Sequence, residues 1–377
     1  MSHPHTEPAL HQTPFKKFHE SHGAKFVEFA GWEMPIHYGS IIDEHKQCRE
    51  SGALFDVSHM GRVKISGRHA RKYLETLLTR KVSDMEPKTC RYSMVCNPSG
   101  GVLDDVLVYR FEEHWLLVVN ASNREKLLAH FEAVKQDGSF VVEVEDQTLK
   151  TAMVAVQGPR VMEMIGKFSS EVPTLGYYTF CQKNLMVLKM TISRTGYTGE
   201  DGVEVILGAG MAEMAVKLLL KDAQTVKPAG LGARDSLRLE AGMPLYGHEL
   251  DEETDPLSAG LKFAVSLDKD QSGDGPEVPR FIGQDALEKI AADGPSRQLI
   301  GLKLDGKRTP RQGAVVQTGD GQSGAVTSGC FSPTLGYPIA LAYVPRGSAA
   351  VGDTVGVVLG RNTLDAEVVK RPFYKRS

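Results

Sequence analysis

The chain has 377 residues, of which 41% are hydrophobic and 24% charged, a balance typical of folded globular proteins. This composition excludes a disordered chain, a collagen-like fibre and a disulfide-stapled miniprotein. The net charge of −3 and the pI near 6.5 give no overall attraction to nucleic acid or to an anionic membrane, and no apolar run is long enough to span a bilayer. A chain of this length needs more than one hydrophobic core, so we expect more than one domain.

The cysteines and the N-terminus indicate the cellular compartment. The five cysteines include no C-x-x-C pair, and their number is odd, so we expect reduced thiols rather than a disulfide framework or a zinc site. The first fourteen residues, MSHPHTEPALHQTP, contain no apolar h-region and no arginine, which argues against a secretory signal and a mitochondrial transit peptide. The sequence therefore predicts a short, partly ordered tail on a cytoplasmic protein.

Strands and helices alternate through the first two thirds of the chain. Helical spacing of apolar residues predicts a helix over 68–80, and Ser122 followed by Glu125 forms a capping-box pattern for a helix over 123–136. The polar residues 112–114 separate two apolar runs, which indicates a β-hairpin. The strands expected in this part are 61–66, 102–111, 115–119, 141–144 and 152–156.

Turn and breaker residues delimit the elements that follow. Pro159 opens a helix that runs to about residue 168, and a second helix over 233–241 ends at Gly242. A glycine-rich turn separates two further strands. The remaining elements expected here are strands over 185–194 and 202–207 and a helix over 211–221.

The composition changes near residue 268. The segment 268–280 is polar and rich in glycine and proline, which is typical of a linker. A helix over 283–292 follows, and from Arg297 onward only short strands separated by glycines are expected, which favours a small β-barrel or sandwich. The sequence thus predicts a mixed α+β body over 1–280 and a β-rich C-terminal domain over 281–377.

One glycine string could suggest a nucleotide site. The segment 319–324 reads GDGQSG, but a dinucleotide-binding loop needs a strand before it and a helix after it. Strands are expected on both sides, so we interpret the string as a hairpin turn.

Two adjacent acids interrupt an apolar run at Asp104 and Asp105. Side chains alternate across a strand, so one carboxylate faces each side of the sheet. A carboxylate that faces a buried layer must be paired or functional. The alternative is an edge-strand acid in solvent.

Two further segments combine glycines with charged residues. The loop 194–202 reads RTGYTGEDG, from which Tyr197 and Glu200 can project, and its alternative is a plain hairpin with solvated acids. The segment 230–242 reads GLGARDSLRLEAG and places Arg234 in the first turn of a helix, and its alternative is a surface helix with ion pairs at i,i+4 spacing.

Taken together, these segments closely resemble the aminomethyltransferase of the glycine cleavage system, the T-protein family. The resemblance covers nearly the whole chain in family order, so it is specific. It is carried by GWEMPIHYG (31–39), ALFDVSHMG (53–61), RYSMVCNPSGGVLDD (91–105), LLVVNASNREK (116–126), SRTGYTGEDGVEV (193–205), GLGARDSLRLEAGMPLYGHEL (230–250) and TSGCFSPTLGYPIALAYV (327–344).

The resemblance implies a tetrahydrofolate-dependent one-carbon transferase. In this family, a lipoylated H-protein carries an aminomethyl group on its dihydrolipoyl arm. The transferase passes the carbon to tetrahydrofolate, which gives 5,10-methylenetetrahydrofolate and releases ammonia. The implied fold is a multidomain cloverleaf around a central folate channel, with a small C-terminal β-barrel. Tetrahydrofolate is then a co-substrate, and neither a metal nor a flavin is expected.

The resemblance also implies roles for particular residues. The glutamate of the Y-T-G-E motif, Glu200 here, is expected to accept the pterin N–H groups in a fork, and Arg234 is expected to contact folate. Asp105 matches the catalytic aspartate of the L-D-D motif better than Asp104 does. Further folate-binding positions are Met60, Tyr92, Val118, Asn120 and Tyr197, with Lys375 or Arg376 near the tail of folate.

Two alternatives stay open at this point. The first is a stand-alone folate-dependent demethylase on the same scaffold. The second is a non-enzymatic folate-binding accessory protein, but such relatives carry a cysteine in a K-G-C-type motif where this chain reads YTGEDG.

Overall fold

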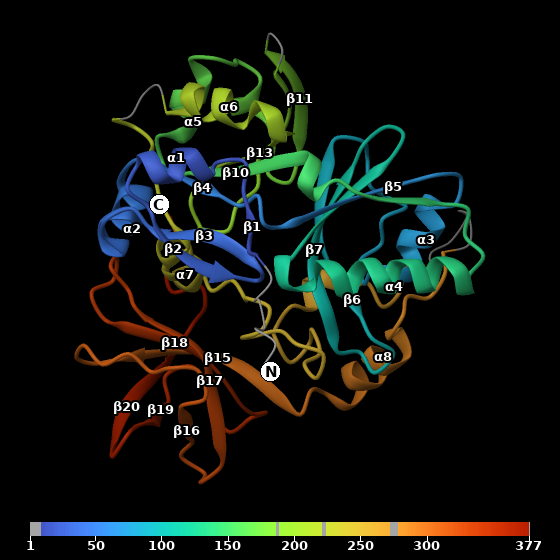
Figure 1. Cartoon of the computed structure of the whole chain (residues 1–377). Coiled ribbons are helices and arrows are strands. Elements are labelled where there is room, and N and C mark those ends of the chain that lie inside the picture. The colour runs from blue at the N-terminus through green and yellow to red at the C-terminus, as the bar shows by residue number, and fades with distance from the viewer. Residues whose placement is uncertain (1–8, 186–187, 221–223, 272–277, 377) are drawn as a thin grey trace, which may run out of the picture.

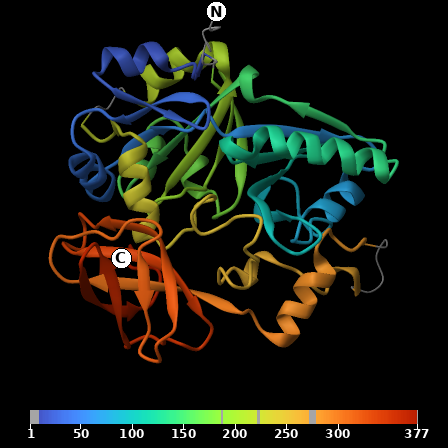
Figure 2. The same ribbon diagram turned by 60° about the horizontal axis from the view of Figure 1, so that its bottom comes forward.

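The polypeptide forms three lobes around a common centre (Figure 1). The computed structural model describes residues 9–185, 188–220, 224–271 and 278–376. The lobes are a six-stranded sheet with helices, a five-stranded sheet with helices, and a closed barrel, and the barrel stands apart from the two sheets in Figure 2. The prediction of a mixed α+β chain that ends in a small β-barrel is confirmed.

The first lobe is built on a six-stranded sheet in the order β11-β12-β13-β10-β4-β14. Its central strands are buried along most of their length and mainly apolar, because helices cover one face and another layer of the molecule covers the other. Its strands are β4 (Ala53–Asp56), β10 (Thr151–Gln157), β11 (Phe180–Leu185), β12 (Leu188–Ser193), β13 (Gly202–Gly208) and β14 (Lys227–Pro228), and its helices are α1 (Lys16–Ser21), α5 (Val161–Gly166) and α6 (Ala212–Leu219).

Two predictions in this lobe need correction. The single strand expected over 185–194 is the second arm of an antiparallel hairpin, since β11 pairs with β12. The helix expected to open at Pro159 begins at Val161 and ends at Gly166, because a 3₁₀ turn over 172–174 takes up the chain that follows. The end of the helix predicted over 211–221 lies outside the described residues.

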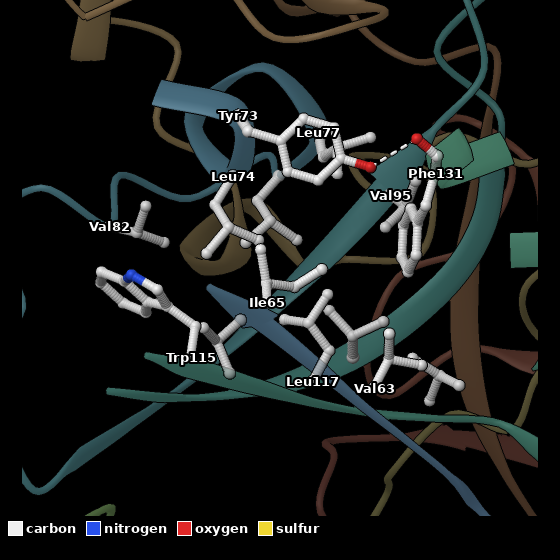
Figure 3. Packing of buried hydrophobic residues seen from close by; sticks show 14 of the residues in the cluster. Val63, Ile65, Tyr73, Leu74, Leu77, Val82, Val95, Trp115, Leu117 and Phe131 are labelled. Atoms are coloured by element: carbon white, nitrogen blue, oxygen red, sulfur yellow. Dashed lines mark hydrogen bonds between the residues drawn. The ribbon is translucent and has the colours of Figure 1, made fainter. Parts of the chain in front are cut away.

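The second lobe is a five-stranded sheet in the order β6-β7-β8-β5-β9. Helix α3 packs its apolar face onto this sheet. Figure 3 shows Tyr73 and Leu74 of α3 above Ile65 and Leu117, with the Tyr73 hydroxyl donating to the Phe131 carbonyl of α4 at 2.5 Å. The elements are β5 (Gly61–Ser66), β6 (Thr89–Cys96), β7 (Val102–Arg110), β8 (Trp115–Val119), β9 (Glu143–Asp146), α3 (Ala70–Leu77) and α4 (Arg124–Asp137).

The start of α4 differs from the predicted capping box. A 3₁₀ turn over Ala121–Asn123 precedes the helix, which places Asn123, not Ser122, at the cap position without a capping side-chain bond. The Asn123 side chain instead binds Asp104 on β7, with 2.6 Å between Nδ2 and Oδ1. Asn123 therefore fastens this turn to the sheet.

A three-stranded sheet in the order β1-β3-β2 and two helices connect the lobes. Residues 1–8 of the expected tail lie outside the described residues, while His11 and Gln12 form β1 and pair with β3, so this part of the tail is ordered. The elements are β1 (His11–Gln12), β2 (Lys25–Phe29), β3 (Trp32–His37), α2 (Ile41–Glu50) and α7 (Leu231–Glu240).

The third lobe is a closed six-stranded barrel with its own apolar core. The GDGQSG string joins β16 to β17, which pair antiparallel, so the interpretation as a hairpin turn is confirmed. The strands are β15 (Arg297–Leu304), β16 (Val315–Gln317), β17 (Ser323–Phe331), β18 (Pro338–Pro345), β19 (Thr354–Leu359) and β20 (Asn362–Val369), and α8 (Gln284–Asp293) precedes them.

The segment 268–280 is not uniformly solvent-exposed. Lys269 is buried and donates to the Glu75 carboxylate at 3.0 Å, so its first residues are anchored to α3, while residues 272–277 lie outside the described residues. The domain boundary at residue 280 stays a prediction.

Two observations bear on the chain as a whole. All five cysteines are free thiols, as expected. Within the described ranges, no helix combines the length and the apolar composition that crossing a membrane requires.

Candidate active site

A hollow of about 530 Å³ lies between the two sheet lobes and helix α7. This volume is in the range of small-molecule sites. Its walls come from β2, β3, β6, β7, β8 and α7 and from the loops around residues 195 and 245. The structure brings seven of the predicted site residues into these walls: Met60, Tyr92, Asp105, Val118, Asn120, Tyr197 and Arg234.

Glycines let the backbone of two walls approach closely. A Cβ atom at Gly230 would lie 2.4 Å from the Ile36 carbonyl oxygen, so this glycine allows α7 to start against β3. A Cβ atom at Gly196 would lie 1.9 Å from Gln157 Oε1. The glycines of both motifs therefore serve packing that places Tyr197 and Arg234 at the hollow.

Asp105 lies in the wall of the hollow, held by two donors. The Tyr92 hydroxyl donates to its Oδ2 at 3.0 Å, and Asn120 Nδ2 donates to its Oδ1 at 2.7 Å. Burial raises the pKa of Asp105, and the hydrogen bonds from Tyr92 and Asn120 oppose this rise. Asp105 can therefore accept a proton from a ligand near neutral pH more readily than an exposed aspartate can.

Asp104 points to the other side of β7 and is 0% exposed. Its carboxylate accepts three N–H groups, from the Asn120 backbone at 2.9 Å, from Asn120 Nδ2 at 2.8 Å and from Asn123 Nδ2 at 2.6 Å. Burial and the neighbouring Asp105 raise the pKa of Asp104, while these donors oppose the rise. Neither Asp104 nor Asp105 is therefore an edge-strand acid in solvent, because both accept hydrogen bonds from neighbouring side chains.

Glu204 of β13 also lines the hollow, and the sequence analysis did not single it out. It is 7% exposed, and its Oε2 accepts from the Thr195 hydroxyl at 2.6 Å. Among the described residues, Oε1 has no hydrogen-bond partner. The available signal was a single acid inside the apolar strand 202–208, the same signal that marked Asp105.

Arg234 supplies a cation to the same wall. Its guanidinium lies 4.9 Å from the centroid of the Tyr197 ring, and its buried Nη1 has no hydrogen-bond partner in the described parts of the chain. Burial lowers the pKa of Arg234, opposed by the nearby Glu204. An unpaired buried N–H group of this kind is available to a ligand acceptor.

His59 adds a neutral polar group. It is 5% exposed, its ring lies edge-on to Phe29 at 5.4 Å between centroids, and its Nδ1 has no partner among the residues described. Burial lowers the pKa of His59 to about 4, with the Arg234 and Arg62 charges acting in the same direction. His59 is therefore uncharged at neutral pH.

The structure does not bring Glu200 into the hollow, contrary to the expectation from the Y-T-G-E motif. Its side chain is buried and accepts from Arg49 Nη1 at 2.9 Å. Arg49 also donates to Glu240 at 2.8 Å, and the Tyr374 ring stacks 3.9 Å from its guanidinium. Glu204, four residues later on strand β13, lines the hollow instead.

The two C-terminal cations also lie outside the hollow. Lys375 is exposed, and Arg376 lies 3.8 Å from Asp201 and contacts the Tyr177 hydroxyl. The C-terminal segment is held here because the Tyr374 backbone N–H donates to the Glu240 carbonyl at 2.8 Å. This path directs it along the outside of the loop 194–202.

Comparisons with known proteins agree with this geometry. Residues 15–269 match the family model "GCVT N-terminal domain", and residues 297–375 match "Glycine cleavage T-protein C-terminal barrel domain". An aminomethyltransferase of Rubrobacter xylanophilus is 44% identical over 97% of this chain and 95% of its own length, and one of Symbiobacterium thermophilum is 40% identical over 97% and 98%. The crystal structure of glycine cleavage system aminomethyltransferase T from Bartonella henselae superposes with a TM-score of 0.88 at 33% identity, over 97% of this chain and 98% of that one.

Proposed function

Because this chain belongs to the glycine cleavage T-protein family and is an aminomethyltransferase, we propose that its central hollow binds tetrahydrofolate and is where the carbon is transferred. The observation that carries the proposal is the presence of two carboxylates in one hollow, the half-buried Asp105 and the buried Glu204, each with a different environment.

Glu204 suits the pterin ring. A pterin presents an amide N–H beside a 2-amino group, and a carboxylate can accept both in a fork. The free Oε1 of Glu204 and its Oε2, which already accepts from Thr195, supply that fork in a buried position. Arg234, with an unpaired Nη1 close by, can donate to the pterin carbonyl oxygen. The fork expected at Glu200 is therefore proposed for Glu204.

Asp105 suits the reacting end of the cofactor. Transfer forms a bond between the carbon and N5, breaks the carbon–sulfur bond, and closes the ring at N10 with loss of ammonia. The N5 and N10 protons leave the cofactor, the sulfur gains one proton, and ammonia takes the other. A carboxylate with a raised pKa can accept and return a proton, and its negative charge stabilises the cationic carbon in passage.

The remaining wall residues orient the cofactor. Tyr92 and Asn120 hold Asp105, while Met60 and Val118 supply apolar wall and Tyr197 stacks on Arg234. A role for Lys375 or Arg376 at the folate tail has no support from their positions outside the hollow.

The donor of the carbon is proposed to be a lipoylated H-protein in the cytoplasm. Family membership supports the glycine cleavage system, and a carbon that arrives on a swinging arm needs an open hollow such as the one found here. The described residues contain no group of three or more His, Cys, Asp or Glu arranged for a metal ion. The absence of a metal and a flavin stays a prediction. The comparisons favour neither the demethylase nor the accessory protein.

Titration calorimetry with tetrahydrofolate tests the site. Glu204→Gln places an amide donor against the pterin donors and is expected to cost on the order of 2–5 kcal/mol of binding. Glu200→Gln is the matched control, because it changes the same chemical group four residues away outside the hollow. Its affinity is expected to stay within about threefold of wild type, a difference below 1 kcal/mol. Unchanged affinity in Glu204→Gln, with a loss in Glu200→Gln, would restore the assignment from the motif and overturn this one.

A further inference from the structure

The side-chain amide of Asn120 is held between two carboxylates. Its Nδ2 lies 2.8 Å from Asp104 Oδ1 and 2.7 Å from Asp105 Oδ1. An amide nitrogen has two protons, and Asp104 also accepts from the Asn120 backbone N–H and from Asn123 Nδ2, so the donors around Asp104 leave its oxygens as acceptors. Both protons are therefore used, one by each acid.

This arrangement fixes which amide atom faces a ligand. If the amide were turned over, its oxygen would face two carboxylate oxygens, so the nitrogen must lie toward the acids. Asn120 lines the hollow, and its Oδ1 has no hydrogen-bond partner among the described residues. The oxygen is thus the amide atom left to meet a bound molecule, and it can only accept.

We propose that Asp104 is a positioning residue, which orients the Asn120 amide so that its nitrogen holds Asp105 and its oxygen accepts a ring N–H of the bound reduced pterin. This inference rests on the proposed function. Asp104 is not among the residues that line the hollow, and the side chain of Asn120 links it to Asp105. The register places it one residue before Asp105 on β7, so the same strand carries the reacting acid on one face and its organiser on the other.

A purely structural role for Asp104 is the competing explanation. Asp104 also accepts from the Asn120 backbone N–H and from Asn123, and these bonds fasten the 3₁₀ turn Ala121–Asn123 to β7. Loss of this fastening alone would lower stability without changing what the hollow presents to a ligand. The two roles therefore differ in their effect on ligand affinity at equal stability.

The Asp104→Asn variant distinguishes the positioning role from the purely structural role. One acceptor oxygen becomes an amino group, so at least one N–H that now faces Asp104 must lose its acceptor. The Asn120 backbone N–H cannot turn, whereas the amides of Asn120 and Asn123 can. In the variant, the remaining oxygen of residue 104 is therefore expected to accept from the Asn120 backbone N–H, and the side-chain amides of Asn120 and Asn123 are expected to turn over. Asn120 would then present its amino group to the pterin and would no longer donate to Asp105.

Asn123→Ala is the matched control, because it removes one bond to Asp104 but lies outside the hollow. Affinity for tetrahydrofolate is measured by calorimetry, turnover by kcat and KM, and stability by thermal unfolding. In Asp104→Asn, we expect affinity to fall about tenfold, the size of one lost hydrogen bond, and kcat to fall by at least as much. In Asn123→Ala, we expect both to stay near wild type even though the melting temperature falls.

The outcomes are distinct. Wild-type affinity in Asp104→Asn, or an equal loss of affinity in Asn123→Ala, would overturn the positioning role while leaving the proposed function intact. A wild-type protein that does not bind tetrahydrofolate would overturn both.

A second measurement applies if Asp104→Asn does not fold. In ¹⁵N-labelled wild-type protein, the two Asn120 side-chain protons are predicted to exchange slowly with water, before and after tetrahydrofolate is added, because each is hydrogen-bonded to a carboxylate. Fast exchange of either proton in the free protein would contradict the orientation on which the proposal rests.

Discussion

His59, in the wall of the hollow, is kept uncharged at neutral pH by burial. Its pKa is lowered to about 4 from the ordinary 6.5, so the unfolded chain binds a proton between these values and the folded protein does not. Stability from this residue is therefore fully present above pH 6.5 and is lost as the pH falls toward 4. The contribution is on the order of 3 kcal/mol at most.

His59→Gln is expected to remove this part of the pH dependence. The measurement is the free energy of unfolding in urea at intervals between pH 7 and pH 4, for the variant and the wild type. The wild type should lose more stability than the variant over this range. Parallel curves would show that His59 is not buried in its neutral form.

At the residue scale, the sequence predicted the acid on one strand and missed the acid on another. The apolar run around Asp104 and Asp105 marked the pair as paired or functional, and the family resemblance favoured Asp105. Glu204 carries the same signal within 202–208, but the Y-T-G-E motif drew attention to Glu200. Glu200 forms an ion pair with Arg49, which is 151 positions away in the sequence, so no local pattern could predict that pair.

At the scale of elements, a buried polar network ties α2, α7 and the barrel together. Glu240 of α7 accepts from Arg49 of α2 at 2.8 Å and from Thr334 at 2.8 Å, and lies 3.2 Å from His45. Burial acts to raise the pKa of Glu240, but its partners His45, Ser332 and Arg49 outweigh it and lower the pKa to about 2 from 4.5. The ionised form of Glu240 thus fastens three elements.

A depressed carboxylate pKa gives stability that is present above 4.5 and is lost as the pH falls toward 2. Glu240→Gln is expected to reduce the unfolding free energy at pH 7 by about 3 kcal/mol, the size of a broken buried pair. The unfolding free energy of the variant is also expected to fall less than that of the wild type between pH 4.5 and pH 2. Glu213→Gln is the control, because Glu213 forms an exposed pair with Lys217 on α6. Equal acid sensitivity of Glu240→Gln and wild type would count against the network.

Element boundaries followed local pattern where the pattern was strong. Helix α7 was expected over 233–241 and lies at Leu231–Glu240, because apolar spacing and the terminal glycine both indicate it. The hairpin β11–β12 was missed, because its first strand mixes polar and apolar residues at the edge of the sheet. The predicted capping box does not form, because the turn before α4 is fastened by a hydrogen bond from Asn123 to Asp104. Asp104 lies on β7, so the sequence of the helix alone could not predict this bond.

For the whole molecule, buried bonds join the barrel to the body beside the hollow. Arg238 of α7 donates to Glu249 at 2.9 Å and to Ser328 of β17 at 2.8 Å. The Tyr343 hydroxyl of β18 donates to the Glu249 carbonyl at 2.8 Å. The mixed α+β class of the body and the β-rich class of the C-terminal domain followed from composition and periodicity. The hollow did not, because it exists only where distant segments between Val27 and Phe263 meet, and only the family resemblance anticipated it.

The central claim is that this hollow transfers a carbon from a protein-borne arm to tetrahydrofolate with Asp105 as the reacting acid. A single-turnover assay with aminomethyl-loaded H-protein tests it directly, because it isolates transfer from product release. Wild type should form methylenetetrahydrofolate and ammonia in equal amounts. Asp105→Asn should slow this step about tenfold or more, roughly 1.4 kcal/mol in the barrier, while binding tetrahydrofolate with similar affinity. No product from wild type, or a full rate in Asp105→Asn, would contradict the account.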